Sequence, residues 1–298
     1  MTNRTLKPYK PPQRGFFNFR TGAVTSAKEA LIIAGVSRLE EERTAHSVIL
    51  RWTVGCDWLG AVLNWSSRAC CVAQRDPAQW CVLGIDGEAG ILRGVDLEEE
   101  SVGAQSLYAV ASAASGLHAV GAGGQHFVSQ DGASWKPYDT TRPGKGPLLE
   151  AVTAIDDDEV YAVGAEGSVV LASRGRSTLI ETPTNVVLAG VCLGPDDLLY
   201  ACGQRGVVLR GRGRHWSVVE HTDTSEDLWS VCAFQGRVFA VSTRMLYEVT
   251  GTALRRVEIR GDCPTSFYHL SSCSNEALLS VGQFDVSLFD GERWRNLC

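Results

Sequence analysis

A short phrase recurs along this chain, and its spacing constrains the fold more than any other feature. Each copy is an apolar run that ends in Ala-Val-Gly or a close variant. The best copies end at five anchor residues: Gly121, Gly164, Gly203, Ser242 and Gly282. Successive anchors are separated by 43, 39, 39 and 40 residues. A period of about 40 residues built from strands is typical of β-propellers, in which each repeat is one four-stranded blade.

Two weaker copies extend the repeat towards the N-terminus. The sequence WCVLG ends at Gly84, and LIIAG ends at Gly35, 49 residues earlier. This long first interval predicts an insertion, within residues 37–45 or 53–65. Seven anchors predict an all-β chain that forms a single seven-bladed β-propeller of four-stranded antiparallel blades. We place the propeller at residues 16–298 and a basic, Pro-rich tail at residues 1–15.

The strands of one repeat are named A to D, from the innermost to the outermost. In the fourth repeat we expect them at residues 148–154, 159–163, 168–173 and 177–182, because turn residues separate these runs. The anchor glycine is expected to turn the chain out of strand B with a positive φ. Two modes of ring closure stay open: simple packing of the first blade on a complete last blade, or addition of residues 16–19 to the last blade.

Composition narrows the class of protein. The net charge is −6, so the basic excess of a nucleic-acid-binding protein is absent. No apolar run approaches the length needed to cross a membrane, and the N-terminus does not have the pattern of a secretory signal. Several cysteines fall at core-like strand positions, as reduced thiols do: Cys81, Cys192, Cys202, Cys232 and Cys273. We therefore predict a cytoplasmic protein, whose basic N-terminal segment is either solvated or a docking arm for an acidic partner.

A second motif carries a family resemblance. Asp-Gly-x-x-Trp occurs at residues 131–135 and 290–294, with a degenerate copy at residues 212–216. Together with the anchor phrase, it resembles the BNR/Asp-box-like β-propeller repeats of the photosystem II assembly-factor family and of YVTN- and WD-like bacterial propellers. The motif itself favours a structural role, since its Asp can bond the turn's backbone amides while its Trp packs between blades. The resemblance implies a fold and says little about function.

The sequence gives little support for a catalytic site or a cofactor site. Sialidases share Asp boxes, so a sialidase-like or other glycan-processing enzyme is the alternative function. Its candidate carboxylates on the turns between strands B and C are ordinary turn residues: Asp86, Glu88, Glu166 and Asp285. Residues 121–124 and 142–146 are Gly-rich without the strand–loop–helix context of a phosphate-binding loop. No Cys/His cluster has zinc spacing, and the acidic run 156–159 occupies an expected hairpin, so we predict no metal and no cofactor.

The predicted function is that of a non-catalytic, stoichiometric binder of a partner protein in a bacterial cytoplasm. It is either an assembly factor or an immunity protein that neutralises a cognate toxin, and we expect neither nucleic-acid binding nor membrane insertion. The second residue of each A strand varies, whereas its Leu and Val neighbours hardly do, which indicates a position at the funnel mouth instead of the inter-blade core. The alternative, that these side chains fill the ring's interior, stays open. The predicted contacts lie on the face of the B–C turns and D–A loops: Tyr108, Glu166, Arg205, Trp229, Arg244, Tyr268 and Asp285, with Arg142 and Lys145 nearby in one D–A loop.

Overall fold

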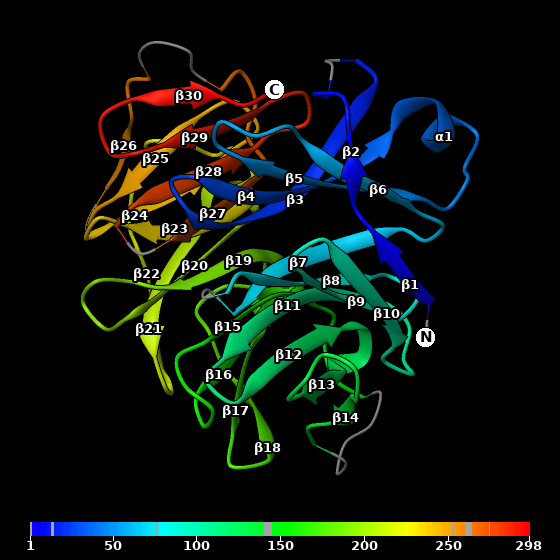
Figure 1. The fold of residues 1–298 in the computed structure, drawn as a ribbon. Coiled ribbons are helices and arrows are strands. Elements are labelled where there is room, and N and C mark those ends of the chain that lie inside the picture. The colour runs from blue at the N-terminus through cyan, green and yellow to red at the C-terminus, as the bar shows by residue number, and fades with distance from the viewer. Residues whose placement is uncertain are drawn as a thin grey trace.

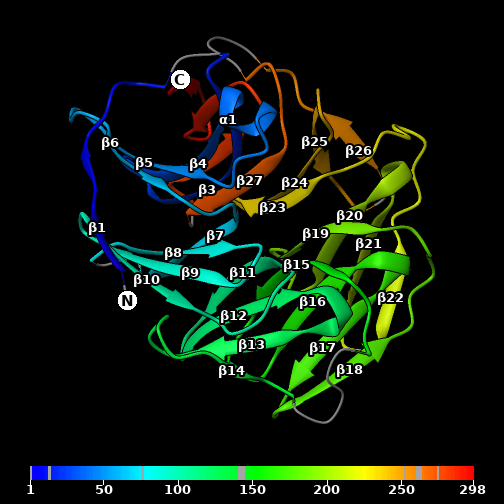
Figure 2. The same ribbon diagram turned by 90° about the vertical axis from the view of Figure 1, so that its right-hand side faces the viewer.

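Antiparallel sheets follow one another along the chain and are arranged around a central axis (Figures 1 and 2). The computed structural model describes residues 2–12, 15–74, 77–139, 145–251, 253–259, 264–273 and 275–298. Over these ranges it contains seven sheets, and in each of them four strands follow one another in chain order from the axis outwards. The predicted seven-bladed β-propeller of four-stranded antiparallel blades is therefore confirmed.

The blades follow the predicted repeats, and their strands have the following bounds. Blade 1 consists of β3 (Phe17–Ser26), β4 (Glu29–Val36), β5 (Ser47–Thr53) and β6 (Leu59–Leu63). Blade 2 consists of β7 (Ser67–Gln74), β8 (Gln79–Gly84), β9 (Glu88–Arg93) and β10 (Asp96–Ser101). Blade 3 consists of β11 (Leu107–Ala113), β12 (Gly116–Gly121), β13 (His126–Ser129) and β14 (Lys136–Pro137). Blade 4 consists of β15 (Leu149–Ala154), β16 (Val160–Gly164), β17 (Val169–Ser173) and β18 (Arg176–Ile180), close to the four predicted ranges.

The last three blades complete the ring. Blade 5 consists of β19 (Leu188–Leu193), β20 (Leu199–Gly203), β21 (Val208–Arg212) and β22 (His215–Val218). Blade 6 consists of β23 (Ser230–Phe234), β24 (Arg237–Val241), β25 (Leu246–Val249) and β26 (Leu254–Arg256). Blade 7 consists of β27 (His269–Cys273), β28 (Ala277–Val281), β29 (Val286–Phe289) and β30 (Trp294–Asn296). The helical elements are short: α1 (Ser37–Glu41), η1 (Ala122–Gly124), η2 (Ala165–Gly167) and η3 (Gln204–Gly206).

The anchor glycines lie at equivalent ends of the B strands, but not for the expected reason. Gly164 has φ −177° and Gly203 has φ −168°, which is extended backbone, so the expected positive φ is wrong. Glycine is needed at the anchor because the neighbouring backbone lies too close for a side chain. A Cβ at Gly164 would lie 1.9 Å from the Leu148 carbonyl oxygen. The left-handed residues come two and three positions later, at Glu166 (φ 56°) and Gly167 (φ 68°).

The Asp-box turns have the structural role that the motif indicates. The Asp131 carboxylate accepts hydrogen bonds from the amides of Ala133 and Ser134, at 2.9 and 2.8 Å. Trp135 packs into the apolar cluster that joins blades 2 and 3, and Trp294 packs into the cluster that joins blades 6 and 7. The tryptophans therefore help to hold neighbouring blades together.

The ring closes by packing of blade 1 on blade 7, the first of the two predicted modes. β3 is the innermost strand of blade 1, and blade 7 is built entirely from the C-terminal part of the chain. The two blades share a cluster of buried residues that includes Val24 and Leu279. Across this seam the Phe19 amide donates to the Gln283 carbonyl at 3.0 Å, and the Val24 amide donates to the Ser271 hydroxyl at 3.3 Å.

The N-terminal segment adds a fifth strand to each of two adjacent blades. β1 (Thr2–Thr5) pairs with the outermost strand of blade 2, and β2 (Lys7–Pro8) pairs with the outermost strand of blade 1. Figures 1 and 2 show this segment crossing the outer edges of both blades. Arg4 forms an ion pair with Glu99, so the expectation of a solvated segment is wrong for these residues. The predicted insertion in blade 1 contains α1, within the first of the two predicted ranges.

Candidate functional site at the mouth of the central channel

An open channel of about 1560 Å³ runs along the axis of the ring. Its wall is formed by the innermost strands of all seven blades: β3, β7, β11, β15, β19, β23 and β27. The lining residues are consecutive along each strand, as in Tyr108–Ser112 and Glu150–Ala154. Each of these strands ends its sheet, so a strand edge without a strand partner faces the channel, with backbone as well as side chains. On the β27 edge the Leu270 amide already donates to the Ser230 hydroxyl at 3.1 Å.

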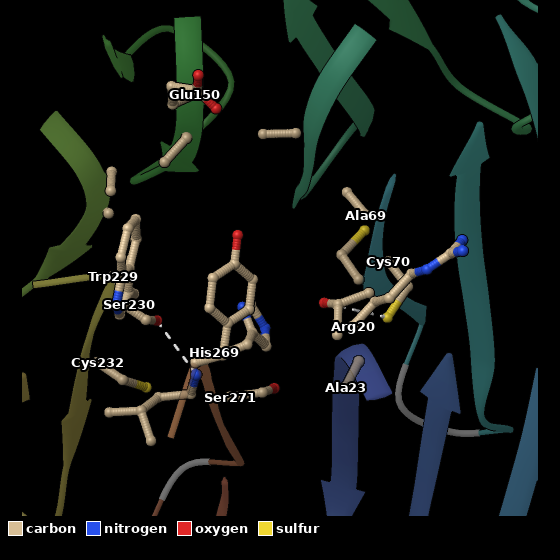
Figure 3. Close-up of a pocket in the computed structure, with 18 of the residues that line it drawn as sticks. Arg20, Ala23, Ala69, Cys70, Glu150, Trp229, Ser230, Cys232, His269 and Ser271 are labelled. Carbon is tan, nitrogen blue, oxygen red and sulfur yellow. Dashed lines mark hydrogen bonds between the residues drawn. The ribbon is translucent and has the colours of Figure 1, made fainter. Parts of the chain in front are cut away.

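One mouth of the channel lies on the predicted face. Residues of the B–C turns line it together with the first residues of the A strands, among them Gln204, Arg244 and Phe284. Figure 3 shows Glu150, Trp229 and Arg20 on different sides of one open space, with His269 of β27 between Trp229 and Arg20. The five variable second residues of the A strands all line this channel: Tyr108, Glu150, Ala189, Trp229 and Tyr268.

Three partly exposed aromatic side chains from blades 6 and 7 form what we call the aromatic rim: Trp229, Tyr268 and Phe284. The Trp229 and Tyr268 rings lie 5.7 Å apart between centroids, and the Trp229 indole donates a hydrogen bond to the Thr243 hydroxyl at 3.0 Å. Tyr268 is 40% exposed and Phe284 is 46% exposed. Large aromatic side chains held in place but left open to solvent are the residue types that dominate binding energy at protein interfaces.

Charged residues surround the channel mouth. Arg68 lies 5.5 Å from the centroid of the Tyr108 ring and 3.4 Å from the Glu150 carboxylate. Arg20 is paired with Glu40. Arg244 is exposed and has no ion-pair partner within the described part of the chain. It is therefore the charge at this mouth that is most available to a ligand.

The structure places the predicted contact residues in three settings. Tyr108, Trp229, Arg244 and Tyr268 line the mouth together. Glu166 and Arg205 are exposed on B–C turns, with φ 56° and 57°, but outside the channel wall. Lys145 is exposed, and Arg142 lies outside the described residues.

Asp285 is the exception, because its side chain is fully buried. Its carboxylate accepts hydrogen bonds from the amide and hydroxyl of Thr265, which tie the B–C turn of blade 7 to the preceding D–A loop. A buried, hydrogen-bonded carboxylate cannot contact a partner, so the candidate site does not include Asp285. Glu166 and Arg205 stand two residues after their anchors, and the residue two after Gly282 is Phe284. Counting from the anchor would have identified Phe284, which the sequence reasoning missed.

Burial lowers the pKa of three histidine side chains: His118, His126 and His269. His269 lines the channel, and burial lowers its pKa to about 4, so it is neutral at pH 7. The Nδ1 atom of His118 lies 2.9 Å from the Nε2 atom of His126, although these residues are eight apart in sequence. Their strands β12 and β13 pair side by side, which brings the rings together in the interior of blade 3. Burial lowers the pKa of both side chains, that of His126 to about 3.

The described residues offer no evident metal or catalytic centre. They contain no group of three or more His, Cys, Asp or Glu side chains arranged to hold a metal ion. Glu150 is the only carboxylate among the described residues of the channel wall, whereas glycoside hydrolysis ordinarily uses a pair. No helix in the described ranges is long and apolar enough to span a membrane.

The fold and the open mouth define a class: a seven-bladed β-propeller with an open central channel that is lined in part by aromatic and cationic side chains. The chain is similar to Immune protein Tsi7 of Pseudomonas aeruginosa, with 29% identity over 299 residues that cover 94% of this chain and 97% of that protein. No family model matches the chain.

Solved β-propeller structures resemble this one at low sequence identity. The WD40 β-propeller domain of Doa1 superposes with a TM-score of 0.74 at 10% identity and covers 98% of each chain. YCF48 from Cyanidioschyzon merolae gives a TM-score of 0.69 at 12% identity, covering 97% of this chain and 100% of that one. A structure of YCF48 bound to D1 peptide gives a TM-score of 0.70 at 12% identity, covering 96% of each chain. At these identities the likeness concerns the fold.

Proposed function

We propose that this chain is an immunity protein, a non-catalytic binder that neutralises a cognate toxin by forming a stoichiometric complex with it. The observation that carries the proposal is the similarity to Immune protein Tsi7, which extends over 94% of this chain and 97% of that protein. A rigid ring with preformed side chains suits this role, because little conformational freedom is lost when the complex forms.

The proposed contact surface is the channel mouth. It comprises Tyr108, Trp229, Arg244, Tyr268 and Phe284, with the exposed Glu166 and Arg205 beside it. Aromatic and arginine side chains of this kind commonly supply most of the binding energy of an interface. The single carboxylate of the described channel wall favours binding over glycan hydrolysis.

We also propose a bacterial cytoplasm as the compartment and Asp-box-like repeats as the origin of the blades. The hydrogen bonds of Asp131 and Asp290 to the amides of their own turns support the second point. The assembly-factor alternative draws on the fold, and one fold neighbour, YCF48, has been solved with a bound peptide. We prefer the immunity role to the assembly-factor role because the similarity to Immune protein Tsi7 extends over nearly the whole of both chains.

Co-expression with a candidate toxin, identified as a protein that the purified chain captures, tests the proposal. We expect that protein to arrest bacterial growth when expressed alone and to be harmless when this chain is expressed with it. Trp229→Ala should weaken protection, whereas Leu179→Ala, which removes an exposed side chain from the outermost strand of blade 4, should not. Continued growth arrest in the presence of folded wild-type chain would contradict the proposed function.

A further inference from the structure

We infer that the channel receives an extended segment of the partner protein, with a carboxylate of that segment beside Arg244. This inference rests on the proposed function and specifies how the partner is held. A protruding loop or chain end, rather than a flat surface, is the kind of element that the channel wall can bind.

The wall offers hydrogen-bonding groups that suit an extended chain. Seven strand edges face the channel, and the consecutive lining residues show that backbone as well as side chains is accessible from it. An extended peptide binds such an edge through its main chain, with side-chain pockets adding specificity. The β23 and β27 edges lie directly below the aromatic rim, which places them where an entering segment would first make contact.

The space in the channel matches a chain segment. Small residues recur along the wall, for example Ala69, Ala109, Ala111, Ala151, Ala189 and Gly190. They leave about 1560 Å³ open, whereas pockets for drug-sized ligands are about 300–1,000 Å³. The volume therefore exceeds what one small ligand needs and accommodates several residues of polypeptide.

Charge indicates the chemistry of the segment. The charged residues among the described part of the wall are Arg20, Arg68, Glu150 and Arg244. The first three are engaged in ion pairs, while Arg244 has no ion-pair partner in the described chain. An acidic side chain of the partner would complement Arg244 at the mouth, and uncharged residues would suit the interior, since a buried unpaired charge is costly.

A variant that blocks the channel tests whether a segment of the partner enters it. Ala189 occupies the position in blade 5 that Trp229 occupies in blade 6, so the fold accommodates a large side chain there. Binding of a purified, non-toxic variant of the toxin should weaken at least about thirtyfold in Ala189→Trp, the size of a hot-spot loss. The control Leu179→Trp adds the same side chain on the outermost strand of blade 4 and should bind as the wild type does. Thermal unfolding of both variants verifies that they are folded.

A charge reversal at Arg244 tests whether a carboxylate of the partner lies beside this residue. Arg244→Glu should weaken binding by about tenfold or more, and Arg255→Glu, a reversal on the outermost strand of the same blade, should not. Hydrogen exchange should slow at the amides of β23 and β27 when the toxin binds. Unchanged affinity in Ala189→Trp together with unchanged exchange at these strands would overturn the inference and leave the immunity role intact. Absence of any complex with the wild-type chain would instead overturn the proposed function.

Discussion

Tryptophan side chains occupy two kinds of position in this ring. Trp294 is 7% exposed, stacks on Phe289 with a centroid distance of 4.9 Å and packs between blades 6 and 7. Trp229 lies at the channel mouth and is held by Tyr268 and Thr243. We predict that Trp294→Ala lowers the free energy of unfolding by about 3–5 kcal/mol. Trp229→Ala should cost about 1 kcal/mol or less and affect binding instead. Urea unfolding followed by fluorescence measures the free energy of unfolding of both variants. Equal losses of stability in the two variants would contradict the distinction between a packing and a binding tryptophan.

The histidine pair of blade 3 makes stability depend on pH. His126 is 8% exposed and stacks on Tyr138 at 4.4 Å, while Asp139 and Asp157 supply nearby negative charge. Burial lowers the pKa of His126 from 6.5 to about 3, so the unfolded chain binds the proton more tightly. The stabilisation is present above pH 6.5 and is lost as the pH falls towards 3. We predict a smaller loss over this range in His126→Gln than in the wild type, measured by urea unfolding. Parallel stability curves would contradict this account.

At the scale of elements, the strand phrases predicted the blades well because their apolar runs and turns repeat in every blade. The sequence did not reveal why the anchors are glycine, since the close approach of Leu148 to Gly164 depends on the pairing of two strands. It also did not place residues 2–8, because their pairing partners lie more than 50 residues away. At the site, the sequence led us to expect Trp229 and Tyr268 at the channel, and both line it, while their contact with a partner stays a prediction. The burial of Asp285 depends on a contact with Thr265 from another loop.

The anchor glycines give a prediction at this scale. A Cβ at Gly164 would lie 1.9 Å from a backbone oxygen, which only a shift of the A strand could relieve. At Gly251 the nearest atom, Nη1 of Arg210, would be 3.9 Å from the added Cβ. We predict that Gly164→Ala destabilises the protein by about 2 kcal/mol or more, while Gly251→Ala changes stability by about 0.5 kcal/mol or less. Chemical denaturation measures the difference, and equal stability of the two variants would refute the argument.

The N-terminal strands give a second prediction. β1 and β2 add main-chain pairing to blades 1 and 2, and Thr5 donates a hydrogen bond to Asp96 at 2.8 Å. Removal of residues 1–9 should lower the melting temperature by several degrees, because about 1–2 kcal/mol of stability would be lost. The ring should persist, since every blade keeps its four strands. Circular dichroism checks both points. An unchanged melting temperature would mean that these strands do not stabilise the blades.

At the scale of the whole molecule, the ring is a scaffold that holds a preformed binding surface. Blade 1 meets blade 7 without exchanging strands, and apolar clusters join neighbouring blades around the axis. Side chains from blades 2, 3, 4, 6 and 7 therefore meet at one mouth, although Arg68 and Phe284 are far apart in sequence. In the proposed function, one mouth at the axis has room for one partner element, so we expect a complex of one chain with one toxin molecule.

Calorimetric titration of the purified chain with a non-toxic variant of the cognate toxin tests the central claim most directly. We predict one binding site per chain and a dissociation constant in the nanomolar range, as in other specific protein complexes of standard size. The active toxin should lose its activity at a one-to-one ratio. Absence of binding heat together with full toxin activity, in the presence of chain whose circular dichroism shows the folded ring, would contradict the account.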